Sequence, residues 1–310
     1  MRISVIIPSY QTAAYLEQTL LSVLEQGHAD LELLVIDGGS TDGSIDILRK
    51  YERHLAFWCS EPDRGQAHAI NKGLHRMSGE VWSYLNSDDL LSPGALRTVV
   101  DLMSDPSLCW LGGVAEIFCG EEIIGRIDAH LPDHKSDFLT PWNRPYPYVF
   151  PCSVASFMRR GLFEEIGDLN EHLHYSMDIE YYARCVFQKN ITPRLIPEIL
   201  GRWRWHDTSK TSGAGMAYGF REDEIQIAET YLSLLTIEEQ ARLKQELRFE
   251  KKQIIARKAV YLHQQGVSGK ALDLLLRSAF SNPSQLWFRP WLGAMRRCFI
   301  PRKQALGTPV

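Results

Sequence analysis

The chain has 310 residues, 45% of them hydrophobic and 23% charged, and its formal net charge at pH 7 is -4. This length and apolar content suffice for one large domain with an appendage or for two modest domains. The charge argues against a strongly basic nucleic-acid binder, so no nucleic-acid partner is expected. The six cysteines are widely spread and form no C-x-x-C pair, which argues against a disulfide framework and a structural zinc site.

Signals for membrane targeting are weak in this sequence. The apolar run near the start stops at Pro8 and is too short for the core of a signal peptide. No stretch approaches the roughly 20 apolar residues that cross a bilayer. We therefore expect a cytoplasmic protein, either soluble or attached peripherally to the inner face of the cytoplasmic membrane.

The first hundred residues alternate between strand-like and helix-like patterns. Apolar, β-branched runs predict strands at residues 3–7, 31–36, 55–59 and 81–85, with helical spacing between them. Ser92 before Pro93 predicts the cap of a helix that runs through Met103. This alternation is typical of an α/β fold whose parallel sheet is covered on both faces and binds ligands at the carboxyl ends of its strands.

Beyond residue 105 the pattern is less regular. We expect a hairpin at residues 115–127, a loop with five prolines at 130–151, a strand at 154–158, and helices near Leu162 and Ile179. From residue 220 onward the chain reads as charged helices, with Thr236 and Glu239 in a capping-box pattern. This region is predicted to be a separate helical extension.

Acidic residues follow three successive predicted strands. Asp37 closes the second strand, Asp63 follows the third, and Asp88 and Asp89 follow the fourth. Because parallel strands bring their carboxyl ends to one edge of a sheet, these carboxylates can converge on one ligand. The alternative is that the segment from Asp37 to Gly43 is only a turn and a helix cap.

Six motifs follow one another along the chain: SVIIPSY, LLVIDGGSTDGS, SEPDRGQAHAINKGL, SGEVWSYLNSDDLL, GLFEEIGDLN and MDIEYYARC. In this order and spacing they resemble the GT-A glycosyltransferases of family 2, over roughly residues 3 to 210. The resemblance implies an α/β fold of GT-A type, a Rossmann-like, mostly parallel sheet with flanking helices, followed by a C-terminal α-helical extension.

The same resemblance implies an activity and a domain division. The activity is inverting transfer of a sugar from a nucleoside-diphosphate sugar to a hydroxyl of a saccharide or lipid-linked saccharide, in polysaccharide or glycolipid biosynthesis for the bacterial cell envelope. We expect a catalytic domain at 1–219, with a nucleotide-binding half at 1–105 and an acceptor half at 106–219. The helical extension then takes residues 220–310.

A dianionic diphosphate needs a divalent cation, and hard oxygen ligands suit Mn2+ or Mg2+. The resemblance places this metal at Asn86-Ser87-Asp88-Asp89, where Ser87 replaces the first acid of the family's motif. We expect Asp89 to contact the metal and Asp88 to contact the ribose or, secondarily, the metal. The alternative is a helix N-terminus that carries acids.

The resemblance also assigns residues to the donor. Asp37 and Asp63 are expected on the base and ribose, and the edge of the pocket at the first strand is expected from Pro8, Ser9 and Tyr10. Tyr10 is alternatively a core aromatic. Basic residues are expected nearby: Arg64 at the base or diphosphate, and Lys72 at the diphosphate or donor sugar, unless Lys72 only orients its helix.

The catalytic base of an inverting transfer is one carboxylate that removes the proton of the acceptor hydroxyl. Asp178 matches the position of the family's catalytic aspartate, although Met177 replaces the Glu that usually precedes it. The alternative is a helix N-cap. Residues 130–151 are expected to line the acceptor side of the cleft with Trp142, Tyr146, Tyr148 and Phe150.

A late segment, GRWRWHDTSKTS, resembles the family's R-x-H segment. It makes His206 a candidate metal ligand or diphosphate donor and Arg204 a source of charge for the diphosphate or donor sugar. The alternative is a structural histidine.

Two other functions compete with the transferase. A nucleotidyltransferase that makes sugar nucleotides usually carries a Gly-rich, basic loop after its first strand, whereas this chain has Pro8-Ser9-Tyr10-Gln11 there. A non-catalytic nucleotide-sugar-binding module would not need the acids described above.

The end of the chain has a marked charge asymmetry. Beyond Asp273 it carries six basic residues and no acid, and residues 280–303 interleave them with aromatics. The basic residues are Arg277, Arg289, Arg296, Arg297, Arg302 and Lys303, and the apolar ones are Phe280, Trp287, Phe288, Trp291, Phe299 and Ile300. This pattern favours peripheral membrane contact. The alternative is that the aromatics pack the extension onto the catalytic domain.

Overall fold

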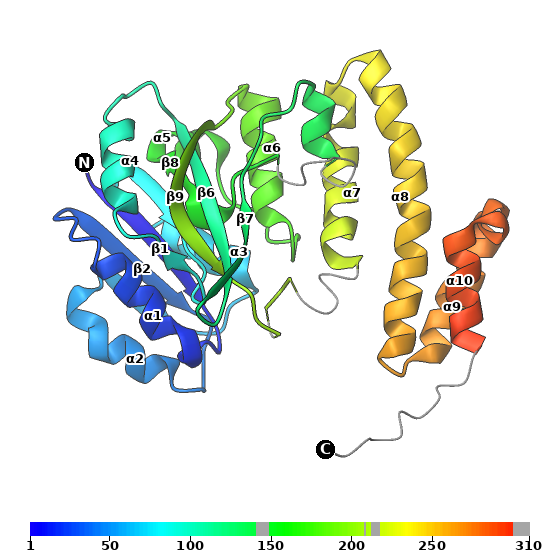
Figure 1. Ribbon diagram of the computed structural model, residues 1–310, viewed down its shortest axis with the longest axis horizontal. Coiled ribbons are helices and arrows are strands. Elements are labelled where there is room, and N and C mark those ends of the chain that lie inside the picture. Colours follow the sequence, from blue (N-terminus) through cyan, green and yellow to red (C-terminus); the bar gives the residue numbers. More distant parts are fainter. Residues whose placement is uncertain (141–148, 208, 212–217, 300–310) are drawn as a thin grey trace. The chain divides into compact units, whose positions relative to one another are not determined.

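The structure is a computed structural model that describes residues 1–140, 149–207, 209–211 and 218–299 (Figure 1). The chain forms two compact units, Met1–Asp207 and Thr208–Val310, and each is described by itself. The division lies before the one expected between residues 219 and 220. Trp142, Tyr146, Tyr148, Ile300, Arg302 and Lys303, for which we expected acceptor or membrane contacts, lie outside the described residues.

A nine-stranded sheet in the order β3-β2-β1-β4-β8-β6-β9-β5, with β7 paired to β6, forms the centre of the first unit. Neighbours among β1 to β4 are parallel, β8 is antiparallel to β4 and β6, and β9 is parallel to β6. Because β8 runs opposite to both β4 and β6, β6 runs in the same direction as β1 to β4, and so does β9. The strands are β1 (Ile3–Ser9), β2 (Leu31–Asp37), β3 (Phe57–Ser60), β4 (Val81–Tyr84), β5 (Leu90–Leu91), β6 (Trp110–Cys119), β7 (Glu122–Ile127), β8 (Ser156–Arg159) and β9 (Arg194–Arg204).

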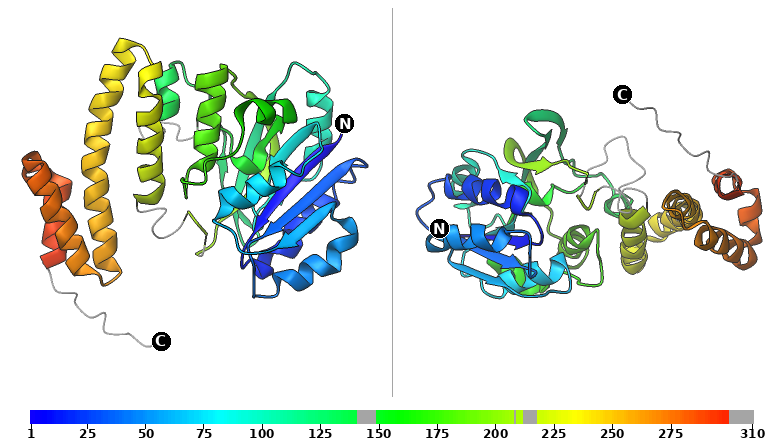
Figure 2. Two further views of the ribbon diagram at one scale, coloured as in Figure 1. Left: turned by 180° about the vertical axis from the view of Figure 1, so that it is seen from behind. Right: turned by 90° about the horizontal axis from the view of Figure 1, so that it is seen from below.

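Helices cover both faces of this sheet (Figures 1 and 2). One face buries alternate strand residues against α1 (Ala13–Leu24), α2 (Ser44–Tyr51) and α4 (Ala95–Met103). The other carries α3 (Gln66–Leu74), α5 (Arg160–Ile166) and α6 (Met177–Lys189), with Trp82 of β4 against Phe163 and Tyr181. Short 3-10 helices are η1 (Glu52–His54), η2 (Lys135–Leu139), η3 (Ser153–Ala155), η5 (Leu232–Leu234) and η6 (Pro283–Trp287).

Most of the expected elements are confirmed, but two expectations are wrong. The helix expected after Ser92 begins at Ala95, because Gly94 takes a left-handed conformation (φ 80°) at its N-cap. Phe150 is 3% exposed and stacks on Phe138 in the core, with ring centroids 5.0 Å apart, so it does not face an acceptor. β9 was not expected at all.

Four helices form the described part of the second unit: α7 (Phe220–Tyr231), α8 (Ile237–Gln264), α9 (Ser268–Ser281) and α10 (Arg289–Phe299). The capping box at the start of α8 is confirmed, because Thr236 Oγ1 accepts from the Glu239 N–H and the Glu239 carboxylate accepts from the Thr236 N–H. Small residues and the buried Trp291 join α8, α9 and α10 in one core. None of the described helices combines the length and apolarity needed to span a bilayer.

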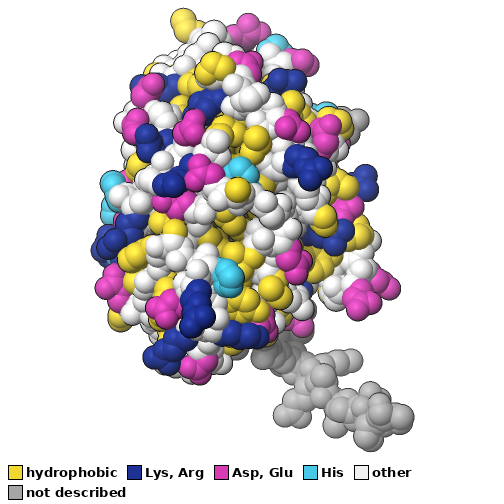
Figure 3. Space-filling model, turned by 90° about the vertical axis from the view of Figure 1, so that its left-hand side faces the viewer, with side chains coloured by type: hydrophobic (Ala, Val, Ile, Leu, Met, Phe, Trp, Pro, Cys, Tyr) yellow, Lys and Arg dark blue, Asp and Glu magenta, His cyan; other side chains and the backbone are white. Residues whose placement is uncertain are grey.

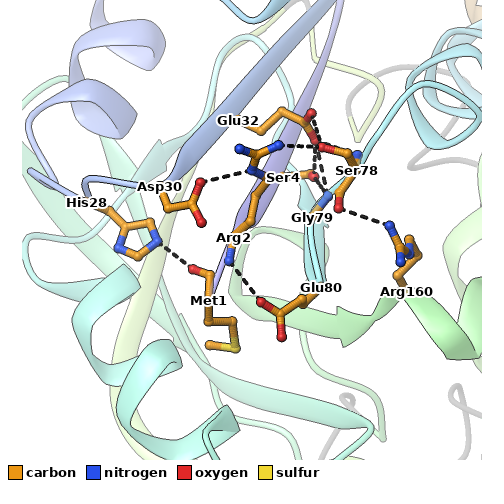
Figure 4. A network of polar contacts seen from close by, with 10 residues as sticks. All are labelled: Met1, Arg2, Ser4, His28, Asp30, Glu32, Ser78, Gly79, Glu80 and Arg160. Carbon is orange, nitrogen blue, oxygen red and sulfur yellow. Dashed lines mark hydrogen bonds and ion pairs between the residues drawn. The ribbon is translucent and has the colours of Figure 1, made fainter.

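A polar network ties the amino-terminal end of β1 to β2 and to the turn before β4 (Figure 4). The Glu32 carboxylate accepts from Ser4 Oγ at 2.5 Å and from both Oγ and N of Ser78 at 2.7 Å. The Gly79 N–H also donates to it. Burial raises the pKa of Glu32, but these hydrogen bonds outweigh burial and bring the pKa below 4.5.

Glu32→Gln is expected to lower the free energy of unfolding by about 1 to 2 kcal/mol at pH 7. Because the folded-state pKa is lowered, this stabilisation is present above pH 4.5 and is lost as the pH falls through the folded-state pKa. Urea unfolding at pH 7 and between pH 4.5 and 3 measures the difference, with the exposed Glu25→Gln as control. If the difference in free energy of unfolding between the wild type and Glu32→Gln stayed the same in acid, this account would be contradicted.

Candidate active site

The expected site residues gather where the parallel strands end. Ser9 ends β1, Asp37 ends β2 and Arg204 ends β9. Asp63 follows β3 and the Asp88-Asp89 pair follows β4. Because these strands run in one direction, the sheet brings segments that are far apart in sequence to a single edge.

The acidic turn after β4 contains one buried and one accessible carboxylate. Asp89 is 1% exposed, and its oxygens accept from the Arg204 N–H at 2.8 Å and from Asn86 Nδ2 at 3.0 Å. Asp88 keeps 23% of its side chain exposed and lies 2.9 Å from His206 Nε2. Burial, and then the charge of Asp88, raise the pKa of Asp89 well above its usual value. Negative charge is therefore costly here unless a cation compensates it.

Arg204 holds this turn from β9. Its Nε donates to the carbonyl oxygen of Asp88 at 2.6 Å, and its Nη2 donates to Gln18 Oε1 at 2.8 Å. The guanidinium lies between two rings, 4.9 Å from the centroid of Tyr15 and 4.5 Å from that of Phe118. Since the residue is only 8% exposed, most of its hydrogen-bonding capacity serves the fold. Its expected contact with the diphosphate or donor sugar stays a prediction.

Asp37 is fully buried and organises the turn that follows β2. Its carboxylate accepts from Gly39 N, Ser40 N, Ser40 Oγ and Ser60 Oγ at 2.6 to 3.0 Å. The turn alternative is therefore present in the structure, whereas a contact with the base stays a prediction. Pro8 and Ser9 are also buried, and Ser9 Oγ lies 3.2 Å from Thr12 Oγ1.

The side chains of Tyr10 and Asp63 lie close to Gly38, beside the buried turn. A methyl group at Gly38 would lie 2.7 Å from Asp63 Oδ2 and 3.2 Å from Tyr10 Cδ2. Tyr10 is 62% exposed, which rules out the core alternative and leaves its ring available for stacking. Asp63 is oriented by the Gly65 N–H, which donates to its Oδ1 at 2.7 Å.

The two basic residues expected at the donor both have acidic partners. Arg64 Nη2 lies 2.6 Å from Glu171 Oε2, and Lys72 Nζ lies 2.8 Å from Glu61 Oε1. Asn71 fixes the same helix by exchanging two hydrogen bonds with the backbone of Leu169. A diphosphate would have to compete with these carboxylates, so the assigned contacts of Arg64 and Lys72 stay predictions.

Asp178 lies in the first turn of α6, whose N-cap is Ser176, so the N-cap alternative for Asp178 is wrong. Its carboxylate accepts from the Ile179 N–H at 2.9 Å, near the positive end of the helix dipole. The residue lines a cavity of about 10 Å³, the space of one water molecule, together with Tyr84 and Tyr182. Burial and then the charge of Asp178 raise the pKa of both tyrosines.

Sequence reasoning missed the residues that connect these groups. Burial raises the pKa of Cys152 to about 12, and the charges of Asp89 and Asp178 both add to this shift, so the two acids share one neighbourhood. Hydrogen bonds also join Gln66 Nε2 to Asn86 Oδ1 and Thr12 Oγ1 to Ser87 Oγ. Asn86 and Ser87 were visible in the motif, but no local pattern distinguishes Gln66 or Cys152.

The mixed sheet has helices on both faces and acids at the carboxyl ends of its parallel strands. These features are those of an α/β fold of GT-A type. The family model "Glycosyl transferase family 2" matches residues 4–167, which is more than half of the chain. The chain therefore belongs to glycosyltransferase family 2.

Two curated relatives support this membership. An uncharacterized glycosyltransferase of Nostoc sp. is 36% identical over 171 residues, covering 54% of this chain and 53% of the relative. A Bacillus subtilis protein assigned provisionally to teichuronic acid biosynthesis, the glycosyltransferase TuaG, is 38% identical over 110 residues, covering 34% of this chain and 43% of the relative. The chain thus matches about half the length of these relatives.

Solved structures of low sequence identity share the fold. TarS 1-349 of S. aureus in complex with UDP-GlcNAc aligns with a TM-score of 0.58 at 16% identity, covering 96% of this chain and 80% of the other. The mannosyltransferase PcManGT of Pyrobaculum calidifontis, in complex with GDP-Man and Mn2+, aligns with a TM-score of 0.55 at 19% identity, covering 96% and 85%.

Gly38→Ala is expected to weaken binding of a nucleoside diphosphate about tenfold with little change in stability. The added methyl group displaces the flexible Asp63 side chain and crowds Tyr10, while Gly38 needs no left-handed backbone. Titration calorimetry and thermal unfolding measure the two effects. Gly161→Ala, whose methyl group meets nothing within 4 Å, is the matched control. Equal binding by both variants would remove Gly38 and its neighbours Tyr10 and Asp63 from the nucleotide site.

Proposed function

We propose that the protein is a metal-dependent, inverting glycosyltransferase that moves a sugar from a nucleoside-diphosphate sugar to a hydroxyl of a saccharide or lipid-linked saccharide. The observation that carries the proposal is that three groups lie at or near one sheet edge: the Tyr10 and Asp63 side chains beside Gly38, the Asp88–His206 pair, and Asp178, whose charge acts on Cys152 together with that of Asp89. A nucleoside, a cation with its diphosphate, and a reacting hydroxyl need these three kinds of group.

The donor class rests on Tyr10 and Asp63 and on the relatives. Tyr10 offers an exposed ring for a base, and Asp63 offers a carboxylate oriented for a ribose or base donor group. The structures of TarS and PcManGT hold UDP-GlcNAc and GDP-Man. The similarity to TuaG, a protein assigned provisionally to teichuronic acid biosynthesis, supports a role in bacterial surface polysaccharide synthesis.

The residues of the acidic turn fit a Mn2+ or Mg2+ ion. Asp88 and His206 present an oxygen and a nitrogen side by side, and the buried Asp89 adds a charge whose cost a cation offsets. The described residues bring no three His, Cys, Asp or Glu side chains together as a ready cation cage. Such a site matches Mg2+-type binding, in which one or two carboxylates are completed by substrate phosphates and water. When bound, the ion neutralises the leaving diphosphate.

Asp178 is proposed as the general base. Its carboxylate lies in a helix first turn, where the dipole favours the negative charge that a general base needs. The charges of Asp89 and Asp178 both act on the buried Cys152, which supports a position of Asp178 near the acidic turn. For inversion, an acceptor hydroxyl at Asp178 would have to approach the donor sugar from the side opposite the diphosphate. In a single displacement this geometry inverts the anomeric configuration.

Asp88→Asn is expected to abolish the rise in melting temperature that Mn2+ with a nucleoside diphosphate gives the wild type, with little change in the melting temperature of the free protein. Asp89→Asn is expected to lower the melting temperature itself, because its new amide cannot accept from both Arg204 N and Asn86 Nδ2. The exposed Asp101→Asn is the control. A full Mn2+ response in Asp88→Asn would remove Asp88 from the metal site.

Asp178→Asn is expected to reduce transfer by several orders of magnitude while leaving the affinity for nucleoside diphosphate with Mn2+ unchanged, because a base acts in the transition state. Single-turnover transfer, with donor hydrolysis followed with and without Mn2+, measures this and tests the nucleotidyltransferase and binding-module alternatives. Equal losses of donor affinity and of turnover would favour a structural role for Asp178.

A further inference from the structure

The helices α8 and α10 of the second unit enclose a groove of about 510 Å³. Helical spacing explains its walls: residues at 253, 256, 257, 260, 261 and 264 share one face of α8, and residues at 289, 290, 293 and 297 share one face of α10. Trp291 points instead into the core and donates to Ser278 Oγ at 3.0 Å, which fixes α10 beside the groove.

The charge of the groove is positive. Its lining includes Arg257, Arg289 and Arg297 and no acid, and within the described part of the chain none of these arginines forms an ion pair. Residues 248–299 contain ten Lys or Arg against two acids, Glu250 and Asp273, which pair with Arg221 and Arg277. By contrast, basic and acidic side chains are interspersed on the face of the molecule shown in Figure 3.

Besides the arginines, the lining combines apolar side chains with Tyr261 and the amides of Gln253 and Gln264, and the groove is larger than a small anion. Its apolar floor consists of Ala256, Val260 and Pro290, whose side chains offer no hydrogen bond to a phosphate. Phe280 and Trp287 are each 87% exposed, and Trp287 lies two residues before Arg289. Exposed aromatics beside arginines are typical of the headgroup boundary of a membrane.

We propose that this groove binds the phosphate headgroup of an anionic lipid, with the three arginines on the phosphate and the apolar floor against the adjoining glycerol and chain carbons. This site is separate from the acidic edge of the sheet and does not rest on the transferase assignment. The proposal differs from the expectation that residues 280–303 contact a membrane by themselves. Trp291 is a core residue, and the groove is lined by α8 as well as by α10.

Flotation of the full chain with vesicles of phosphatidylglycerol and phosphatidylcholine tests the proposal. Arg257→Gln, Arg289→Gln and Arg297→Gln together are expected to weaken vesicle binding about tenfold more than Lys270→Gln, Arg277→Gln and Arg296→Gln together. Both sets remove three positive charges, but only the first lines the groove, so general attraction to the surface falls equally in both. Equal losses would overturn the proposal.

A second pair of variants keeps every charge. A side chain at Gly293, which lines the groove, meets nothing within 4 Å, so Gly293→Leu is expected to fill the groove and weaken flotation severalfold without unfolding α10. Gly269→Leu, equally open but outside the groove, is the control. Thermal unfolding checks that each variant is folded.

The source of the phosphate is tested in the same assay. Vesicles of phosphatidylcholine alone are expected to bind weakly, and millimolar inorganic pyrophosphate is expected to compete only partly. Unchanged flotation of Gly293→Leu would overturn the proposal. So would pyrophosphate binding that is lost in the groove triple while flotation is retained, because the groove would then serve a free anion.

Discussion

The hydrogen bond from the Arg204 N–H to the buried carboxylate of Asp89 joins the two halves of the catalytic sheet, and the site depends on it. A carboxylate taken out of water needs such partners, and a hydrogen bond to a charged group contributes about 1.5 to 3 kcal/mol. Once β9 is held against the turn after β4, Arg204 supports the backbone of Asp88 and His206 reaches its carboxylate. Residues more than a hundred positions apart thus form one polar cluster.

Electrostatics then determines what this cluster can bind. Two adjacent acids, one of them buried, repel each other, and the Arg204 guanidinium relieves this only in part because it donates to the carbonyl oxygen of Asp88 rather than to either carboxylate. The divalent cation that we propose would offset this repulsion and, in turn, the charge of a diphosphate. Asp178 lies apart from this pair, in the first turn of α6, where the helix dipole favours negative charge.

The sequence predicted the half of the fold that local patterns determine. Buried β-branched runs gave β1 to β4, and the Thr236 capping box marked the start of α8. It could not predict β9, because Pro197 and several charged residues hide the pattern and its pairing with β6 is irregular around that proline. β9 pairs with β6, which lies far from it in the sequence, and no local sequence pattern indicates such a pairing.

The candidate site was predicted in the same uneven way. The motifs identified the acids, and the direction of parallel strands explains why they meet. Three of the hydrogen bonds on Asp37 come from the neighbouring Gly39 and Ser40. Other partners depend on tertiary packing: Ser60 on Asp37, Glu171 on Arg64, and Cys152 near both Asp89 and Asp178. The arginine groove arises likewise from two helices that each look only basic in sequence.

The most direct test of the account is amide hydrogen exchange with and without a nucleoside diphosphate and Mn2+. If the carboxyl edge of the sheet is the donor site, exchange slows at residues 9–12, 37–42, 61–66, 86–89 and 204–206, which lie in separate loops and share only that edge. Unchanged exchange in these segments at saturating ligand, or protection confined to residues 248–299, would contradict it.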